Sequence, residues 1–539
     1  MKVQTWEQVA VRKRKAVLDS IPAEWIIHDD LMPPESQDDV TTFPETSGFF
    51  TAEELAITNS EALELLPKLA SGELKSETVT RAFCKRAAAA HQLINCLSET
   101  CFERGLETAR KLDEHLARTG KPLGPLHGLP VSLKDNFNLA GLDATVGFVS
   151  HVGSPASADA TLAELLQTKA GAVFYVKTNV PTAMMMAETV NNVQGRTVNP
   201  LNRRLTPGGS SGGEAALIAF RGSPLGVGTD IGGSLRIPAA CTGLFTLRPS
   251  FGRFPTLGCR SGMPGQEAVQ SVNGPLARTL GDLEAYCRAV VGAEPWNDAD
   301  PRCLPIPWRL PSPALTKLKF AVMWDDGMAL PTPPVTRALR QTVAALQAVG
   351  HEIVEWSSKD QAQGLDLLNR MFVADGGLAI REEIAKTGEP WFLPEMEAYT
   401  TAQEVGTRDH WRLHAERQAY QKRHLDRWNA AGIDALLCPT TPYASVENGK
   451  FRHVGYTGVY NVLDQSCISF PTGIKVDAGL DKALDMASYQ PMSEVDKMIQ
   501  SEYHAEAVHG MPINLQLIGR RLEEEKVVAM VKVVLDALP

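Results

Sequence analysis

The chain has 539 residues, of which 44% are hydrophobic and 22% are charged, as in an ordinary soluble globular protein. Its formal net charge of −10 argues against a nucleic-acid-binding surface. No stretch approaches the roughly 18 apolar positions of a membrane-spanning helix, and the first residues lack the apolar segment of a secretory signal.

Capping signals predict helices in the first hundred residues. Two pairs have the spacing of a capping box, Thr5 with Gln8 and Thr51 with Glu54. Ser76 is predicted to cap the helix that follows it. The basic run at residues 12–15 is predicted to lie on a solvated helix face. We expect residues 1–75 to form a helical arm that packs on a larger body.

From about residue 125, short apolar runs alternate with helical stretches. The predicted strands cover residues 128–133, 172–176, 225–229, 318–323, 435–438 and 513–518. A helix is predicted over residues 214–220. This alternation is typical of a sheet covered by helices on both faces. Because no repeat or long linker interrupts it, we expect residues 76–539 to form one α/β domain around a mixed, mostly parallel sheet.

Two glycine-flanked serines and one lysine stand out as candidate catalytic residues. Ser210 lies in Pro-Gly-Gly-Ser-Ser-Gly-Gly-Glu, and Ser234 lies in Gly-Thr-Asp-Ile-Gly-Gly-Ser-Leu-Arg-Ile-Pro. Lys134 ends the run Gly-Leu-Pro-Val-Ser-Leu-Lys upstream. A serine needs a base to become a good nucleophile, and acyl transfer needs N–H donors around the developing oxyanion. The set therefore predicts a hydrolytic site.

The backbone before Ser234 is predicted to supply those donors. The three preceding residues could direct their N–H groups into one concavity, and they are Ile231, Gly232 and Gly233. Ser210 directly precedes a predicted helix, whose N-terminus favours negative charge on nearby oxygens. Such an arrangement would stabilise an oxyanion without any metal.

Lys134 can act as a base only when it is neutral. Its ordinary pKa is about 10.4, so burial must lower it by several units. The neighbouring Asp135 would oppose that change. Because successive side chains of a strand face opposite ways, Asp135 is expected to point away from the Lys134 ammonium.

Several motifs together resemble those of a known family. The main elements lie at residues 132–135, 208–214 and 228–238, with further matching stretches at 177–181, 195–200, 274–278, 434–439 and 510–519. In their order and spacing they resemble the amidase signature family over about residues 60–525. The N-terminal arm, residues 188–192 and the Gly519-Arg520-Arg521 ending look most like fungal acetamidase-type general amidases.

The resemblance implies a Ser-cisSer-Lys triad and an acyl-enzyme mechanism. Ser234 would be the nucleophile, Ser210 the bridging serine after a cis peptide bond, and Lys134 the base. The oxyanion hole would span residues 231–234, and Met184 would contact the substrate through its backbone. No cofactor and no metal is implied. Supporting roles are expected for Ser211, Asp230 and Arg236.

The favoured function is hydrolysis of small aliphatic or aryl carboxamides to an acid and ammonia or an amine. Carbamates, esters or fatty acid amides are alternatives within the family. The charged stretch at residues 409–418 disfavours membrane insertion. More remote alternatives are an ammonia-donating amidotransferase subunit, a pure binding module, and an α/β-hydrolase that uses Ser211 with His504 or His509.

The remaining expectations concern partners and location. The nine cysteines are scattered and form no C-x-x-C pair, so neither a disulfide framework nor a zinc site is predicted. This pattern suggests a reducing, cytoplasmic location. The expected partner is a small-molecule amide, without nucleic acid and without membrane insertion, and a homodimer stays open.

Overall fold

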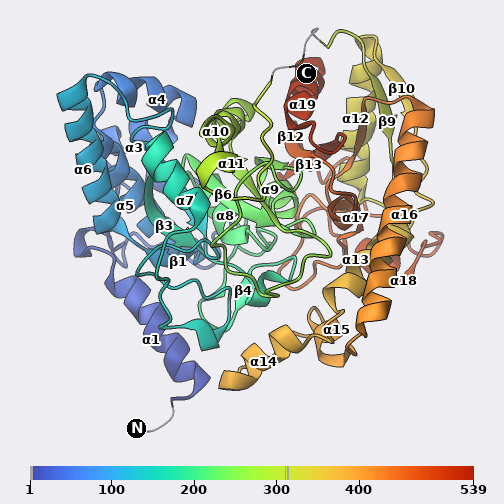
Figure 1. Cartoon of the computed structure of the whole chain (residues 1–539), viewed down its shortest axis with the longest axis horizontal. Helices are drawn as coiled ribbons and strands as arrows, with labels where there is room; N and C mark the ends of the chain where they lie inside the picture. The colour runs from blue at the N-terminus through green and yellow to red at the C-terminus, as the bar shows by residue number, and fades with distance from the viewer. Residues whose placement is uncertain (1–3, 310, 312–314, 539) are drawn as a thin grey trace.

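A sheet of eleven strands crosses the part of the chain that the computed structural model describes, residues 4–309, 311 and 315–538 (Figure 1). Its strands lie side by side in the order β1, β3, β2, β6, β8, β7, β12, β13, β11, β9, β10. The strands are β1 Leu97–Thr100, β2 Pro130–Lys134, β3 Val173–Thr178, β6 Leu225–Asp230, β7 Phe245–Arg248, β8 Val272–Ala277, β9 Lys319–Val322, β10 Glu352–Glu355, β11 Ala435–Pro439, β12 Cys467–Lys475 and β13 Pro512–Ile518, with a separate pair β4 Val190–Asn191 and β5 Gly195–Arg196.

Helices surround this sheet. They are α1 Trp6–Asp19, α2 Phe43–Thr46, α3 Ala52–Asn59, α4 Ala62–Ser71, α5 Ser76–Ile94, α6 Phe102–Thr119, α7 Thr161–Leu165, α8 Gly212–Ala219, α9 Arg236–Thr242, α10 Leu280–Gly292, α11 Pro295–Asp298, α12 Pro333–Ala348, α13 Gln361–Phe372, α14 Leu378–Thr387, α15 Glu397–Thr401, α16 Thr407–Ala431, α17 Gly455–Leu463, α18 Glu494–Glu502 and α19 Glu524–Ala537. Every strand predicted from the sequence is present, with boundaries displaced by a few residues.

The sheet is mixed, as predicted. The parallel neighbours are β3–β2, β2–β6, β11–β9 and β9–β10, and the other neighbouring pairs are antiparallel. The parallel pairs thus lie toward the two sides of the sheet, with antiparallel pairing across its middle. The large α/β domain and its two-sided helical cover are confirmed.

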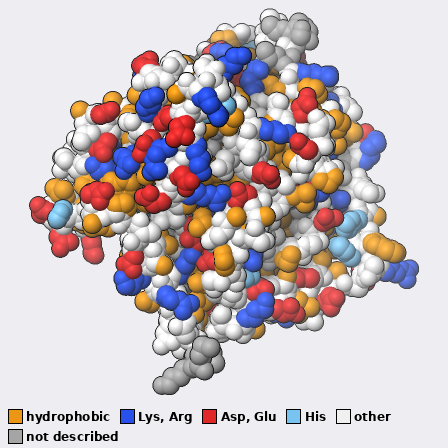
Figure 2. Space-filling view, turned by 60° about the vertical axis from the view of Figure 1, so that its left-hand side comes forward, with side chains coloured by type: hydrophobic (Ala, Val, Ile, Leu, Met, Phe, Trp, Pro, Cys, Tyr) orange, Lys and Arg blue, Asp and Glu red, His pale blue; other side chains and the backbone are white. Residues whose placement is uncertain are grey.

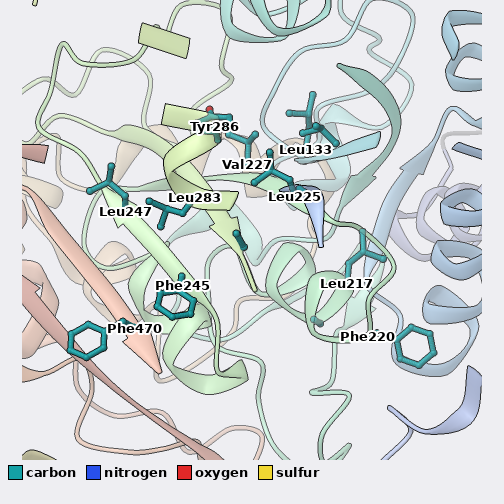
Figure 3. Close-up of a cluster of buried hydrophobic side chains, with 14 of the residues drawn as sticks. Leu133, Leu217, Phe220, Leu225, Val227, Phe245, Leu247, Leu283, Tyr286 and Phe470 are labelled. Atoms are coloured by element: carbon teal, nitrogen blue, oxygen red, sulfur yellow. The ribbon is translucent and has the colours of Figure 1, made fainter. Parts of the chain in front are cut away.

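Strand β6 shows how the sequence separates the two faces. Leu225 and Val227 point to one face, where they pack with Leu283 and Tyr286 of α10 (Figure 3). On the other face, a Cβ at Gly226 would lie 1.9 Å from a carboxylate oxygen of Glu214 in α8. Side chains alternate along a strand, so a glycine on every second position lets α8 approach closely. On the same face, a Cβ at Gly228 would lie 2.7 Å from Ser211 Oγ.

The N-terminal helices pack into the principal hydrophobic core, with Trp25, Phe43 and Leu65 all buried there. Both predicted capping boxes are present at α1 and α3. The predicted cap of α5 is wrong. Its N-cap residue is Lys75, and the backbone N–H groups of Ser76 and Glu77 donate instead to the carboxylate of Asp113 in α6. A side chain distant in sequence therefore provides the capping oxygen.

The basic run at residues 12–15 is only partly solvated. Lys13 is largely buried and forms ion pairs with Glu99 and with Asp143, the latter at 2.9 Å. Burial alone would lower its pKa, but these two carboxylates raise the pKa above its ordinary value. The prediction of a solvated face is therefore wrong for Lys13, which links α1 to the body of the protein.

Charged residues of both signs are spread over the face of the molecule drawn in Figure 2. The face drawn in Figure 2 carries interspersed acidic and basic side chains, without a continuous basic area. Among the described residues, none of the helices combines the length and apolar character needed to cross a bilayer. The long helix α16 is rich in charged residues, several of them paired with one another.

Candidate active site

Lys134 ends β2 in the interior, with no exposed surface. Its Nζ lies 2.8 Å from Ser210 Oγ and 2.9 Å from Thr229 Oγ1. The Thr229 carbonyl accepts a further, longer hydrogen bond of 3.3 Å from Nζ. None of these contacts is a direct ion pair, so the amine sits among neutral oxygens. Such surroundings suit a neutral amine better than an ammonium.

The environment changes the pKa of Lys134 strongly. Burial lowers it from 10.5 to about 7, although the carboxylates of Asp230, Glu214 and Asp135 oppose this change. Asp135 Oδ2 accepts a 2.7 Å hydrogen bond from the N–H of Val146, so this carboxylate is bound away from Nζ, as strand alternation predicts. A large neutral fraction near neutral pH is what a general base requires.

Ser210 lies in the glycine-rich turn that leads into α8. It is almost fully buried, and the peptide bond between Gly209 and Ser210 is cis, as the resemblance implies. A Cβ at Gly209 would lie 2.7 Å from the N of Glu188 and from the O of Met186. Only glycine lets the backbone of this turn come so close to the neighbouring segment. The close approach places Ser210 against Lys134.

Ser234 lies between β6 and α9 and is half-buried. It lines a cavity of about 180 Å3 together with Ser210, Thr229 and Met184. Among the described residues, the Ser234 hydroxyl makes no hydrogen bond, and none joins it to Ser210. The two predicted serines therefore face one cavity, and the lysine lies directly behind Ser210.

The loop before Ser234 corrects one predicted oxyanion donor. The N–H of Gly233 donates to Asp230 Oδ1 at 2.8 Å, because the loop folds back over that carboxylate. Gly233 is therefore a loop-shaping residue, and its φ of +132° is one that residues with a side chain avoid. In the described chain, the N–H groups of Ile231 and Gly232 donate to no side chain.

Asp230 and Arg236 form a buried ion pair beneath this loop. Arg236 Nε lies 3.1 Å from Asp230 Oδ2, and both side chains are fully buried. Burial alone would raise the pKa of Asp230, but the Arg236 guanidinium holds it well below its usual range. Asp230 also accepts hydrogen bonds from the N–H of Leu235 and from Asn461 Nδ2. The pair thus fixes the loop that carries Ser234.

Glu214 in the first turn of α8 is a fully buried carboxyl group close to the lysine. It accepts hydrogen bonds from the hydroxyls of Ser132 and Thr178, the latter at 2.6 Å. Burial raises its pKa to about 7, while the two hydroxyls and Lys134 oppose the change. In the sequence analysis, Glu214 was only the first residue of a predicted helix, and Thr229 was missed. Thr229 stands next to Asp230 in the quoted motif, which was the available signal.

Met184 and Ser234 line both the first cavity and a second one of about 260 Å3. Met184 has a φ of +59° and follows Ala183 with a φ of +57°. Two successive non-glycine residues in this conformation are strained and mark functional sites more often than ordinary loops. The second cavity is mostly apolar, with Met185, Met186, Ile237, Leu368, Phe372, Tyr399 and Phe451 in its wall.

Ser211 does not have the surroundings of a nucleophile. It is fully buried, and its hydroxyl donates to the carbonyl of Thr229 at 3.3 Å. His504 and His509, the nominal partners of a nucleophile elbow, are exposed on the surface. These positions favour the supporting role predicted for Ser211.

Comparisons with known proteins find a matching family, similar sequences and a similar solved structure. The family model described as Amidase matches residues 78–528. Acetamidase of Emericella nidulans is 41% identical, with 98% of this chain and 97% of the relative covered. Acetamidase of Aspergillus oryzae is also 41% identical, with 98% of each covered. A solved structure of a fatty acid amide hydrolase has a TM-score of 0.93 at 33% identity, covering 98% of this chain and 94% of the other.

Proposed function

The chain belongs to the amidase family and is an amide hydrolase, and on that premise we propose that it cleaves small carboxamides through an acyl-enzyme on Ser234. The observation that carries this proposal is the 2.8 Å contact between Lys134 Nζ and Ser210 Oγ beside the cavity that Ser234 lines. Through the Ser210 hydroxyl, this contact connects Lys134, whose pKa is lowered, to the cavity that Ser234 lines.

In the proposed reaction, Ser234 Oγ attacks the amide carbonyl and loses its proton to Ser210, whose own proton passes to neutral Lys134. The protonated relay then delivers a proton to the leaving nitrogen, and ammonia or an amine departs. Water attacks the acyl-enzyme through the same relay and releases the acid. The Ser234 hydroxyl can rotate about χ1 toward Ser210, since it has no competing hydrogen bond in the described chain.

The oxyanion would be held by the N–H groups of Ile231 and Gly232. Their freedom from side-chain acceptors supports this role, and the buried Asp230–Arg236 pair keeps the loop in place. A single oxyanion donor of this kind contributes about 3–4 kcal/mol to the transition state. Met184 would position the substrate through its backbone carbonyl, since its N–H already donates to Pro181.

Two observations bear on the substrate. The relatives named acetamidase match nearly the whole chain, and the cavity of about 180 Å3 suits a small molecule. The apolar cavity of about 260 Å3 beside Met184 and the likeness to a fatty acid amide hydrolase favour a second candidate function, hydrolysis of amides with a longer acyl chain.

The nine cysteines are free thiols, which supports the proposed cytoplasmic location.

A panel of amides tests this proposal. Ammonia release is measured from acetamide, benzamide and oleamide with the wild type, with Ser234→Ala and with Ser271→Ala, a serine that lines the same cavity but is not assigned a role. We expect turnover of acetamide or benzamide by the wild type and Ser271→Ala, and none by Ser234→Ala. Preference for oleamide would favour the second candidate, and full activity of Ser234→Ala would overturn the mechanism.

A further inference from the structure

A cavity of about 400 Å3 lies next to the catalytic one, and Glu267 and Gln270 line both. One wall is a face of α16, where residues spaced by three or four positions follow one another: Arg417, Gln421, His424 and Trp428. The opposite wall comes from the end of α17 and from Arg520 and Arg521. Helices α16 and α17 pack side by side in Figure 1.

Arg417 makes no direct ion pair with the two carboxylates that line this cavity, Asp464 and the exposed Glu267. Within the described chain it forms no ion pair and no hydrogen bond, and its Nε is buried without a partner. The nearby Asp464 is already occupied, since it accepts from Arg521 at 2.7 Å, from Arg248 at 3.0 Å and from the N–H of Phe251 at 2.9 Å. Arg417 is half-buried and its guanidinium stays charged there, so leaving its buried Nε without a partner is costly.

Trp428 adds a second unmatched donor to the same wall. Its side chain is 1% exposed, yet its indole Nε1–H has no acceptor. An indole N–H can only donate, and a buried donor without a partner is rare in folded proteins. The Arg520 guanidinium lies 5.7 Å from the Trp428 ring centroid, which brings a second cation close to this donor.

The cavity wall also has an apolar part. Val269, Leu425, Val462 and Leu463 line it beside the polar groups. An inorganic anion would satisfy the donors but leave this surface uncovered. A neutral apolar molecule would cover the surface but leave Arg417 unpaired. The ligand that fits both parts carries one anionic group on a small apolar body.

We propose that this cavity binds a small monocarboxylate with an apolar body, held by Arg417 and Trp428. The planar guanidinium fork matches the two oxygens of a carboxylate, and the indole N–H gives one further hydrogen bond. The apolar body packs against Val269 and Leu425. The site is separate from Ser234, so binding there requires no turnover.

A small monocarboxylic acid is also the kind of product that the reaction proposed for Ser234 would release. A regulatory role of this site therefore rests on the proposed function. The route between the two sites is short. Asn461 lines the carboxylate cavity, and its Nδ2 donates to Asp230 Oδ1 at 2.7 Å. Asp230 in turn holds the N–H of Gly233 in the loop that carries Ser234. A ligand that moves Asn461 would therefore disturb that loop.

Calorimetric titration of the full chain tests the site. The background is Ser234→Ala, which removes turnover, and the ligands are benzoate, acetate as a carboxylate without a large apolar body, and benzyl alcohol as a neutral analogue. We expect benzoate to bind about tenfold or more tightly than either analogue. Adding Arg417→Met should weaken benzoate by about tenfold or more, because it removes a charge-assisted contact. Adding Trp428→Phe should also weaken it.

The matched control is Arg412→Met on the same helix, since Arg412 is exposed and pairs with Asp409. It should leave benzoate affinity unchanged. Undiminished binding to a folded Arg417→Met variant, or no binding at all, would overturn the site. A dimer in sedimentation, together with the absence of benzoate binding in the titration, would assign the cavity to a second copy of the chain. That result would also overturn the carboxylate site.

Steady-state kinetics test the regulatory role. Benzoate that lowers kcat for acetamide in the wild type but not in Arg417→Met would support it, and equal inhibition of both would overturn it. Because the titration uses a variant without the nucleophile, failure of the carboxylate site can be distinguished from failure of the proposed hydrolysis.

Discussion

In the proposed mechanism, the pH dependence of turnover follows from the burial of Lys134. Burial lowers the pKa of this lysine from 10.5 to about 7, a difference that corresponds to about 5 kcal/mol. At pH 7.5, roughly three quarters of the amine is then neutral, against about one in a thousand for a lysine with the ordinary pKa. The buried position therefore raises the neutral fraction of the amine by almost 10³, as an order-of-magnitude estimate.

The expected profile has one rising limb and a plateau. Because only the neutral amine accepts a proton, kcat/KM should rise with pH, reach half its maximum near pH 7 and level off above about pH 8. At pH 6 it should be roughly a tenth of the plateau value. The assay is initial-rate ammonia release from acetamide between pH 5 and 10, with circular dichroism at each pH to confirm that the protein stays folded.

Glu214 has a pKa raised to about 7 by burial and titrates in the same range, so a variant must separate the two groups. The Glu214 carboxylate raises the pKa of Lys134. In Glu214→Gln the limb should persist and move to lower pH. A profile that is flat from pH 6 to 10, a limb that continues rising to pH 10, or a limb that vanishes in Glu214→Gln would refute lysine as the base.

Three substitutions extend the account. Ser210→Ala should lower kcat by about 10²-fold or more while leaving more residual rate than Ser234→Ala, and near-normal ammonia release would remove the bridging role. Gly233→Ala should lower the melting temperature and the activity together, because its Cβ would lie 2.3 Å from Thr457 Oγ1 at a φ of +132°; an unchanged melting curve would contradict this. Arg236→Met should cost about 3–5 kcal/mol in urea unfolding, since it leaves Asp230 buried and unpaired, and a loss below 1 kcal/mol would show that the pair is unimportant.

The strands were predictable because local pattern determines them. The run at 225–229 has apolar residues at positions 225 and 227, the run at 513–518 has them at 513, 515 and 517, and both form strands of the sheet. The capping boxes of α1 and α3 were predictable for the same reason, since all their atoms lie within four residues. The alternating glycines of β6 are visible in the sequence and α8 was predicted as a helix, but their close packing against each other was not predicted.

The missed features depend on residues far apart in the chain. Asp113 caps α5 from α6, Lys13 pairs with Asp143, and Asn461 reaches Asp230 from α17. No local spacing encodes such contacts. The Gly233 donor was misjudged for a related reason: the motif shows an N–H near Ser234 but not that the carboxylate of Asp230 turns back to accept it.

The central claim is that Ser234 is the nucleophile of the Lys134–Ser210 relay. The most direct test is the intact mass of the protein after incubation with a serine-directed fluorophosphonate, followed by peptide mapping of the adduct. The account predicts a single adduct on Ser234, lost in Ser234→Ala and slowed in Lys134→Ala. An adduct on Ser211, or one that forms equally fast without Lys134, would contradict it.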